Sequence, residues 1–399
     1  MLKDKTILLG VSGGIAAYKA AFLASLLVKQ DAIVRVLMTQ NAGKFVSPLT
    51  FETLVGSRVA QDTFDPDYPS ATMHIDLAKQ AQLVLIAPAT ANIIAKLANG
   101  IADDMLTSTV LASTCPKLIA PAMNTHMWQN PVTQANIERL RHFDWKIIEP
   151  GSGRLACGDI GEGKMAEAEE LLDAVLQEIA YEKDLAGWRI LVTAGPTREA
   201  IDPVRFLTNY SSGKMGYAIA RAASLRGAQV TLVTGQTALP PPPYMDIVSV
   251  SSAADMFEAV ISRSEKQDVI IKAAAVADFR PQTTANEKVK KTGEDNLSIP
   301  LARTQDILKY LGEHKPKGQF LCGFSMETEN MIENSKKKLE NKHLDLIACN
   351  NLKDEGSGFI VGTTKLTLIS SDDEIVLPLL DKTAAAHRLL DEIVLRRKA

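Results

Sequence analysis

A glycine-rich turn near the N-terminus has the residue types that bind phosphate. Residues 10–14 (GVSGG) lie between an apolar run at 6–11 and a helical pattern at 15–29. Backbone N–H groups and the helix dipole point at such a turn and attract anions. The turn lacks the G-x-G-x-x-G spacing of dinucleotide folds, and residues 38–40 lack the acid that would bind ribose hydroxyls. We therefore expect a single phosphate, as in a mononucleotide or flavin mononucleotide, with a ligand-free tight turn as the alternative.

Three polar side chains in the first half have positions that suit catalysis. Asn124 follows an apolar run at 117–122, so it should lie at the carboxyl end of a strand, where α/β folds bind ligands. Cys157 lies in a glycine-rich loop (ACGDIG) that does not suit a packed core and that we expect to move as lids do. His74 is the third candidate. A lone histidine is more often structural, and a lone cysteine is more often a small hydrophobe.

Residues 211–216 (SSGKMG) in the second half resemble a P-loop but fail its spacing. Thr208 stands where a P-loop requires glycine, and Met215 stands where it requires serine or threonine. The segment should still begin a helix, so its free N–H groups either hold a phosphate or only cap the helix.

Two lysine groups in the second half could bind a polyphosphate. One is KVKK at residues 288–291, and the other is residues 336–338 with Lys342 on a predicted helix. A helix cannot aim three successive lysines one way, so at most one of 336–338 should face a site. Lys338 and Lys342 are four apart and share a face. A triphosphate needs several such cations, although charge runs are usually solvated faces.

Two series of strand and helix patterns must position these residues. In the first series, apolar runs at 6–11, 33–39, 83–89 and 117–122 alternate with helical patterns, and an acidic amphipathic helix at 166–185 closes it. The second series has strands at 188–195, 228–235, 268–279, 319–324 and 345–350, a hairpin across 365–379, and a final helix from about Lys382. This alternation is typical of doubly wound parallel sheets. We therefore predict two α/β domains, residues 1–186 and 187–399.

The composition excludes several other classes of protein. Of the 399 residues, 46% are hydrophobic and 23% charged, which is incompatible with general disorder. A formal net charge of −3 argues against a bulk electrostatic nucleic-acid binder. Four widely spaced cysteines without a CxxC pair exclude a disulfide scaffold and a cysteine-type zinc site. Apolar runs are too short for a signal peptide or a membrane span, so we expect a cytoplasmic enzyme.

Motifs in both halves resemble those of known enzyme families. In the first half, V-S-G-G-I-A-A-Y-K, A-P-A-T-A-N, P-A-M-N-x-x-M-W and A-C-G-D-I-G-x-G-K-M resemble the flavin-containing cysteine decarboxylases. In the second, A-G-P-T-R-E-x-I-D-P-V-R, N-Y-S-S-G-K-M-G, A-A-V-A-D-F and K-V-K-K look like phosphopantothenate–cysteine ligase. In this order, the chain is similar to the bacterial bifunctional coenzyme A biosynthesis flavoproteins along nearly its whole length. The fold that this implies is a flavodoxin-like or Rossmann-like flavoprotein domain followed by a Rossmann-like ligase domain.

For the first domain the resemblance implies FMN-dependent decarboxylation of 4′-phosphopantothenoylcysteine to 4′-phosphopantetheine. The flavin oxidises the cysteine moiety to a thioaldehyde, so that the carbanion left by CO2 is delocalised, and hydride then returns. By matched motif, His74 is the active-site base or orienting group, Asn124 holds the substrate carboxylate, and Cys157 donates the final proton. The implied FMN contacts are Gly13, Gly14, Ile15, Thr39, Thr90, Ala91, Asn92 and Ala122.

For the second domain the resemblance implies a CTP-dependent ligase. The carboxylate of 4′-phosphopantothenate attacks CTP to give an acyl-cytidylate and pyrophosphate, and the amine of L-cysteine then displaces CMP. By motif, Lys288 stabilises charge during activation and Asn209 handles the acyl-cytidylate. The implied nucleotide contacts are Asp278, Lys288, Asp306, Phe324, Lys338 and Lys342. Mg²⁺ is expected with the triphosphate, with no protein ligands assigned, and the residues alone do not separate CTP from ATP.

Two functions from other classes stay open. One is a flavin-binding regulatory subunit that has lost catalysis, against which the intact His74, Asn124 and Cys157 argue. The other is a nicotinamide dehydrogenase, which the missing acid at residues 38–40 disfavours. The partners expected are the small-molecule substrates, with no nucleic acid and no membrane. The family's flavin-domain trimers and ligase-domain dimers together imply a homo-oligomer, a dodecamer.

Overall fold

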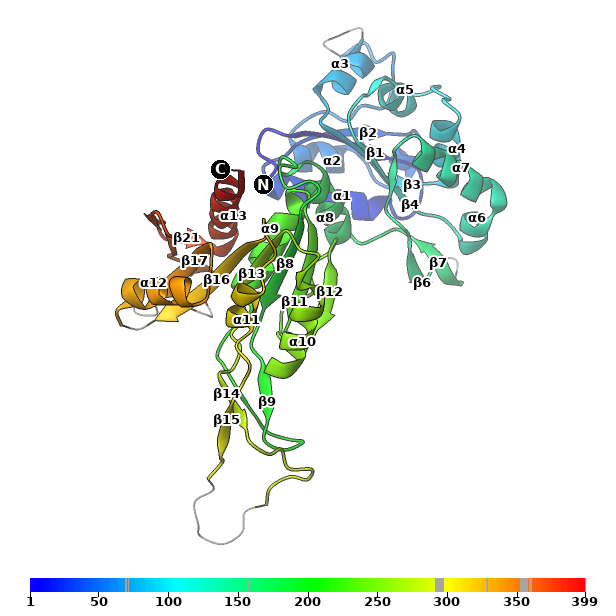
Figure 1. The fold of residues 1–399 in the computed structure, drawn as a ribbon. Coiled ribbons are helices and arrows are strands. Elements are labelled where there is room, and N and C mark those ends of the chain that lie inside the picture. The colour runs from blue at the N-terminus through cyan, green and yellow to red at the C-terminus, as the bar shows by residue number, and fades with distance from the viewer. Residues whose placement is uncertain are drawn as a thin grey trace. The chain divides into compact units, whose positions relative to one another are not determined.

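The chain forms two compact units, Met1–Tyr181 and Glu182–Ala399 (Figure 1). The computed structural model describes residues 1–68, 70, 72–156, 158–290, 298–327, 329–351, 358 and 361–398. Both units are α/β, each with a mainly parallel sheet between helices, so the predicted fold class is confirmed. None of the helices in this described part is long and apolar enough to cross a membrane.

The first unit contains a five-stranded sheet with the order β2-β1-β3-β4-β5. All four strand pairings are parallel. The strands are β1 (Thr6–Val11), β2 (Ile33–Met38), β3 (Leu83–Ala89), β4 (Lys117–Pro121) and β5 (Lys146–Ile147). β1 and β3 are buried throughout, as expected for unbroken apolar runs covered on both faces. This is the flavodoxin-like strand order, in which the topological switch point lies between β1 and β3.

Helices connect these strands and bury their apolar faces against the sheet. They are α1 (Ala17–Lys29), α2 (Pro48–Val55), α3 (Met73–Gln80), α4 (Ala91–Ala98), α5 (Met105–Ala112), α6 (Thr125–Gln129), α7 (Pro131–His142) and α8 (Ala168–Ile179), with a 3-10 turn, η1 (Ala42–Lys44). A hairpin of β6 (Gly151–Arg154) and β7 (Ile160–Lys164) follows β5. The helix predicted to reach residue 185 is wrong at its end, because α8 stops at Ile179.

The second unit contains an eight-stranded sheet with the order β12-β11-β8-β13-β16-β17-β19-β20. Its strands are β8 (Arg189–Ala194), β11 (Gln229–Thr234), β12 (Asp246–Ser249), β13 (Val269–Lys272), β16 (Phe320–Glu327), β17 (Leu346–Asn351), β19 (Thr367–Ile369) and β20 (Glu374–Val376). In chain order the first six strands read 3-2-1-4-5-6, which is the Rossmann arrangement, with its switch point between β8 and β13. The last two are antiparallel, so the predicted hairpin is confirmed.

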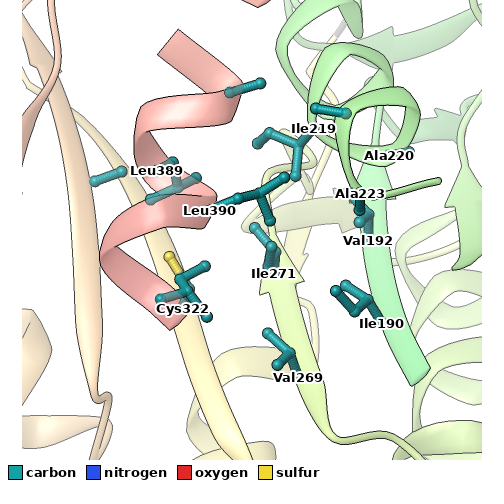
Figure 2. Packing of buried hydrophobic residues seen from close by; sticks show 14 of the residues in the cluster. Ile190, Val192, Ile219, Ala220, Ala223, Val269, Ile271, Cys322, Leu389 and Leu390 are labelled. Carbon is teal, nitrogen blue, oxygen red and sulfur yellow. The ribbon is translucent and has the colours of Figure 1, made fainter. Parts of the chain in front are cut away.

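Five helices cover the two faces of this sheet. They are α9 (Lys214–Leu225), α10 (Ala253–Ser264), α11 (Ile307–Glu313), α12 (Met331–Asn341) and α13 (Lys382–Lys398). Figure 2 shows one core, where Ile190 and Val192 of β8 and Ile271 of β13 meet residues of α9 and α13. Leu191 points to the opposite face, into a second core built with α10, α11 and α12. The alternation of side chains along each strand therefore requires helices on both faces.

The long strand predicted over residues 268–279 is wrong, because β13 ends at Lys272. The following backbone leaves the sheet and bonds the end of β8 and the segment after it. The N–H of Ala274 donates to Thr193 Oγ1 at 3.1 Å, and that of Ala277 donates to Thr197 Oγ1 at 3.0 Å. These bonds satisfy the backbone groups that a strand would have used. Residues 273–278 consequently form a loop at the carboxyl edge of the sheet.

Short strand pairs build an extension from the second unit. β14 (Phe279–Pro281) pairs with β15 (Leu301–Arg303), and β9 (Arg198–Ala200) pairs with β10 (Phe206–Thr208). Figure 1 shows β9, β14 and β15 projecting away from the main sheet. A further pair, β18 (Thr363–Thr364) and β21 (Leu380–Asp381), precedes α13.

Candidate active sites

The first unit has a pocket of about 660 Å³ at the carboxyl ends of its strands. It lies at the β1/β3 switch point, where doubly wound folds bind ligands. The loops after β1, β2 and β3 and the residues before α5 supply its lining, which includes Ser12, Gly13, Thr39, Gln40, Asn41, Gln61, Thr90, Ala91, Asn92, Lys96, Asp103 and Asp104. Most of these groups are neutral hydrogen-bonding groups or small side chains.

The buried hydroxyl of Ser12 joins the two loops at the switch point. Its Oγ donates to the carbonyl of Pro88 at 2.7 Å and accepts from the N–H of Thr90 at 3.0 Å. Thr90 is the N-cap of α4, and its side chain accepts from the N–H of Ile93. The positive end of the α4 dipole therefore opens onto the pocket.

The pocket fits a flavin mononucleotide. Its lining offers a helix N-terminus suited to a phosphate and side-chain amides suited to a neutral polar ring system. Gly13 lets the turn approach the opposite wall, since an ideal Cβ there would lie 2.5 Å from Cβ of Asn41. Five predicted FMN contacts line this pocket, namely Gly13, Thr39, Thr90, Ala91 and Asn92. Gly14, Ile15 and Ala122 are not among its lining residues, and Ile15 is 60% exposed.

An ion pair that the sequence reasoning missed lies at the edge of the same pocket. Lys96 Nζ lies 2.7 Å from Asp103 Oδ1 and 3.7 Å from Asp104 Oδ2. The hydrogen bond to Asp103 raises the pKa of Lys96, so this lysine is cationic at neutral pH. Asp104 also caps α5, because its Oδ1 accepts from the N–H of Thr107 at 2.8 Å. The spacing of the three residues gave no signal of this role.

Asn124 holds the loop before α6 against the β6–β7 hairpin. Its Oδ1 accepts from the N–H of His126 at 2.8 Å, which makes it the N-cap of α6. Its Nδ2 donates to Asp159 Oδ2, also at 2.8 Å. The asparagine thus lies beside the hairpin that contains position 157, and Cys157 itself lies outside the described residues.

Of the three predicted decarboxylase residues, the structure describes His74 and Asn124, and it does not bring these two together in the pocket of the first unit. His74 is half-buried in the first turn of α3, and neither it nor Asn124 lines that pocket. Their catalytic roles therefore stay predictions from the motifs.

The second unit has a larger pocket, of about 740 Å³, at the carboxyl edge of its sheet. The N-terminus of α9, the loop after β13, the start of α11, strand β16 and helix α12 all contribute to its wall. Six predicted site residues line it, namely Asn209, Asp278, Asp306, Phe324, Lys338 and Lys342. Segments separated by more than a hundred positions in the sequence thus meet at the predicted ligase site.

Ion pairs and hydrogen bonds position the cations of this pocket. Lys342 Nζ lies 2.7 Å from Asp306 Oδ2, and Asp306 is the N-cap of α11. Although burial opposes it, the pKa of Asp306 is lowered, because Lys342 and the N–H of Lys309 donate to the carboxylate. Lys338 donates to the carbonyl of Phe324 at 3.2 Å, and burial together with the neighbouring Lys342 lowers its pKa. Lys336 and Lys337 instead pair with Glu374 and Glu333, so only Lys338 of the three faces the pocket.

Asn209 and Lys288, the two predicted catalytic residues of the ligase, occupy different places. The amide of Asn209 donates to the carbonyl of Ala275 in the loop after β13, at 3.0 Å. Lys288 is exposed and does not line the pocket. Its neighbour Val289 donates its N–H to Asp202 at 3.1 Å, which fixes that segment against the turn between β9 and β10. Residues 291–297, including Lys291, lie outside the described residues.

Three further lysines line this pocket, namely Lys214, which lies in the predicted phosphate-holding segment 211–216, and Lys272 and Lys382, which the sequence reasoning missed. Lys382 is 8% exposed and donates to the carbonyls of Gly358 and Val361 at 3.0 and 2.7 Å. Lys272 carried a readable signal, because a lysine inside the apolar run VIIKAAAV is unusual for a buried strand. In the described parts of the chain, no group of three or more His, Cys, Asp or Glu side chains is arranged to hold a metal ion.

Comparisons with known proteins agree with this division into two sites. The flavoprotein family matches residues 1–180, and the DNA/pantothenate metabolism flavoprotein C-terminal domain matches residues 185–396. The chain is 48% identical over 397 residues to the coenzyme A biosynthesis bifunctional protein CoaBC of Bacillus subtilis (strain 168), covering 98% of this chain and 97% of the relative.

Two solved structures each resemble one half. The C-terminal domain of a coenzyme A biosynthesis bifunctional protein CoaBC is 47% identical and has a TM-score of 0.47, covering 54% of this chain and 97% of that one. The FMN-dependent cysteine decarboxylase SpaF is 32% identical and has a TM-score of 0.40, covering 45% of this chain and 100% of that one.

Proposed function

The chain belongs to the family of bifunctional coenzyme A biosynthesis proteins, and from this premise we propose how its residues share the two reactions. The enzyme ligates 4′-phosphopantothenate with cysteine and decarboxylates the resulting 4′-phosphopantothenoylcysteine. We assign the decarboxylase to residues 1–186 and the ligase to residues 187–399. The observation that carries this assignment is the gathering of six motif-matched residues around one pocket of the second unit.

In the ligase pocket, we assign the lysines to the phosphates of CTP, where the negative charge of the reactants is concentrated. The substrate carboxylate attacks the α-phosphorus of CTP, the bond to the bridging oxygen breaks, and pyrophosphate leaves. Lys338 and Lys342 bind the nucleotide, and Asp306 holds Lys342 in place through their 2.7 Å ion pair. Mg²⁺ enters with the triphosphate and offsets its charge.

Asn209 and Lys288 act at different stages of ligation in this proposal. The Asn209 amide is held beside the loop after β13 and contacts the acyl-cytidylate while cysteine attacks it. Lys288 stabilises charge during activation. Because it is exposed and outside the pocket lining, its segment must approach the bound nucleotide for this role.

In the decarboxylase unit, the flavin belongs in the β1/β3 pocket. FMN supplies a reversible acceptor for the electrons of the cysteine moiety when it is bound. The N–H groups at the start of α4 and the turn at Gly13 bind its phosphate end. Asn124 presents its amide to the substrate carboxylate, His74 acts as a base or orients the substrate, and Cys157 provides the final proton.

Exposed apolar side chains support a homo-oligomer. Ile15, Tyr18 and Phe22 are 60%, 60% and 51% exposed and, at spacings of three and four, follow one side of the α1 region. On the extension of the second unit, Phe279 and Leu301 are 49% and 50% exposed. Contiguous exposed apolar groups of this kind mark interaction surfaces. We propose contacts through the first surface in trimers and through the second in dimers, which together build a dodecamer.

Two measurements test the proposed function. The purified protein should be yellow and release FMN on denaturation, and with CTP, L-cysteine and 4′-phosphopantothenate it should form pyrophosphate, CO2 and 4′-phosphopantetheine. A colourless protein would contradict the flavin assignment. A yellow protein without turnover would indicate a flavin-binding subunit that has lost catalysis. Replacing CTP with ATP in the same assay identifies the nucleotide.

A further inference from the structure

Lys272 stands out among the lysines of the ligase pocket because no described residue forms a hydrogen bond or an ion pair with its ammonium. It is the last residue of β13, next to the β8/β13 switch point, and its side chain lines the pocket. Lys342 pairs with Asp306, Lys338 donates to the Phe324 carbonyl, and Lys382 donates to two carbonyls. Within the described residues, the Lys272 ammonium makes no hydrogen bond or ion pair.

The charges that surround Lys272 come from three directions. Lys338 and Lys342, from α12 and its C-cap, repel it, whereas Asp306 at the start of α11 and Asp278 in the loop after β13 attract it. One of these carboxylates is already bonded to Lys342, so three lysines share two acids. Burial, with the two neighbouring lysines, lowers the pKa of Lys272 to about 8. A half-buried cation without a partner is unfavourable unless a ligand supplies the anion.

We propose that Lys272 is a further nucleotide-binding residue of the ligase, whose ammonium binds the phosphate chain of CTP together with Lys338 and Lys342. This inference rests on the proposed ligase function of the pocket. The carboxyl end of a strand at a switch point is where such folds place ligands. A strand holds its terminal side chain more rigidly than a loop does, so Lys272 provides a fixed cation in the pocket.

The test compares Lys272→Met, which keeps most of the length of the side chain but not its charge, with Lys272→Arg, which keeps the charge. A hydrogen bond to a charged group corresponds to roughly a 10- to 100-fold change in affinity. Lys272→Met should therefore weaken CTP binding by about that factor, measured calorimetrically on the full-length protein, and should leave the binding of cytidine unchanged. Lys272→Arg should recover most of the affinity for CTP.

The pH dependence gives an independent readout. Above the pKa of about 8 the wild-type ammonium loses its proton, so CTP affinity should fall between pH 7 and pH 9. The fall should be smaller in Lys272→Arg, because arginine stays protonated over this range. Lys337→Met is the matched control, since Lys337 pairs with Glu333 on the solvent side of α12 and does not line the pocket.

The outcomes separate this inference from the function on which it rests. If the wild type does not ligate 4′-phosphopantothenate to cysteine, the proposed function fails. If the wild type is active but Lys272→Met binds CTP like Lys337→Met, only the role of Lys272 fails. A loss of cytidine and CTP binding together, not recovered by arginine, would show that Lys272 is structural and would also overturn the proposal.

Discussion

Replacing Gly312 with alanine should disrupt the ligase pocket by displacing α11, whose first residues form part of the pocket wall. Gly312 lies in α11, and an ideal Cβ at this position would lie 1.9 Å from the carbonyl oxygen of Lys342 and 2.8 Å from its carbonyl carbon. Real Cβ atoms essentially never approach another heavy atom within 3.0 Å. The helix and the backbone of Lys342 must therefore separate by about 1.1 Å, the difference between 3.0 and 1.9 Å.

This separation acts directly on the site, because Asp306, the N-cap of α11, holds Lys342 Nζ at 2.7 Å through its carboxylate. Overpacking costs about 1–3 kcal/mol, and a backbone carbonyl cannot rotate aside, so we expect a cost near the upper end. The higher helix propensity of alanine stabilises the folded state by about 1 kcal/mol and offsets part of this cost. The free energy of unfolding of the ligase unit should thus fall by about 2 kcal/mol. Since a misplacement of about 1 Å can lower a rate by about 10², ligase kcat/KM should fall roughly 10- to 100-fold.

Ligase and decarboxylase rates measured on the same preparation provide the assay. The decarboxylase rate with added 4′-phosphopantothenoylcysteine should not change, because Gly312 lies in the other unit. Gly362→Ala is the matched control, since nothing lies within 4 Å of an ideal Cβ there, and it should change stability by no more than about 0.5 kcal/mol. Wild-type stability and a wild-type KM for CTP in Gly312→Ala would refute the close contact between α11 and Lys342.

Three further predictions concern the proposed roles and the division of the chain. Asn124→Asp should lower the decarboxylation rate by about 10²–10³ and leave the ligation rate unchanged, because the new carboxylate would face Asp159, whose Oδ2 lies 2.8 Å from the present amide nitrogen. An equal fall in the ligation rate would point to misfolding instead. Lys288→Ala should abolish pyrophosphate release, whereas Asn209→Asp should accumulate the acyl-cytidylate; rapid quenching with mass spectrometry distinguishes them, and the reverse pattern would exchange the two roles. A chain ending near Lys183 should be yellow and decarboxylate, while the chain from Asp184 should be colourless and ligate, since the buried Arg226 keeps both of its carboxylate partners, Asp184 and Asp391, in the second piece. A first piece that binds flavin only when the second is present would contradict that division.

The sequence was most informative where local pattern and burial agree. β1 and β3 have the predicted bounds, because an unbroken run such as TILLGV or LVLIAPA is buried on both faces and ends at a turn or helix cap. The same rule misled at residues 273–278, where AAAVAD is apolar enough for a strand. There the N–H groups bond the side chains of Thr193 and Thr197 and the carbonyl of Gly195 instead of continuing the regular ladder with β8. No local property of residues 273–278 indicates that their N–H groups bond these partners and do not continue a strand.

In the candidate sites, motifs predicted individual residues but not the contacts between them. The match to a family pointed to Asp306 and Lys342, but nothing in their spacing indicated that they form an ion pair. Lys272 and Lys382 belong to no motif that was recognised, and they reach the pocket only through the order of the strands and the helices that follow them. Charged residues that only the topology of the fold brings together are therefore the part of a site that is hardest to predict from the sequence.

The position of α13 in the core has a consequence for synthesis of the protein. Leu389 and Leu390 of this helix cover the same sheet face as Ile219 and Ala223 of α9, so that face is only partly covered until α13 has been translated (Figure 2). At about 5–20 residues per second, the ribosome needs roughly 10 to 40 seconds to proceed from Glu182 to Lys398. During that interval the first unit can fold and take up flavin, while Val192 and Ile271 remain open to chaperones. A message truncated before α13 would thus yield a flavoprotein with no ligase.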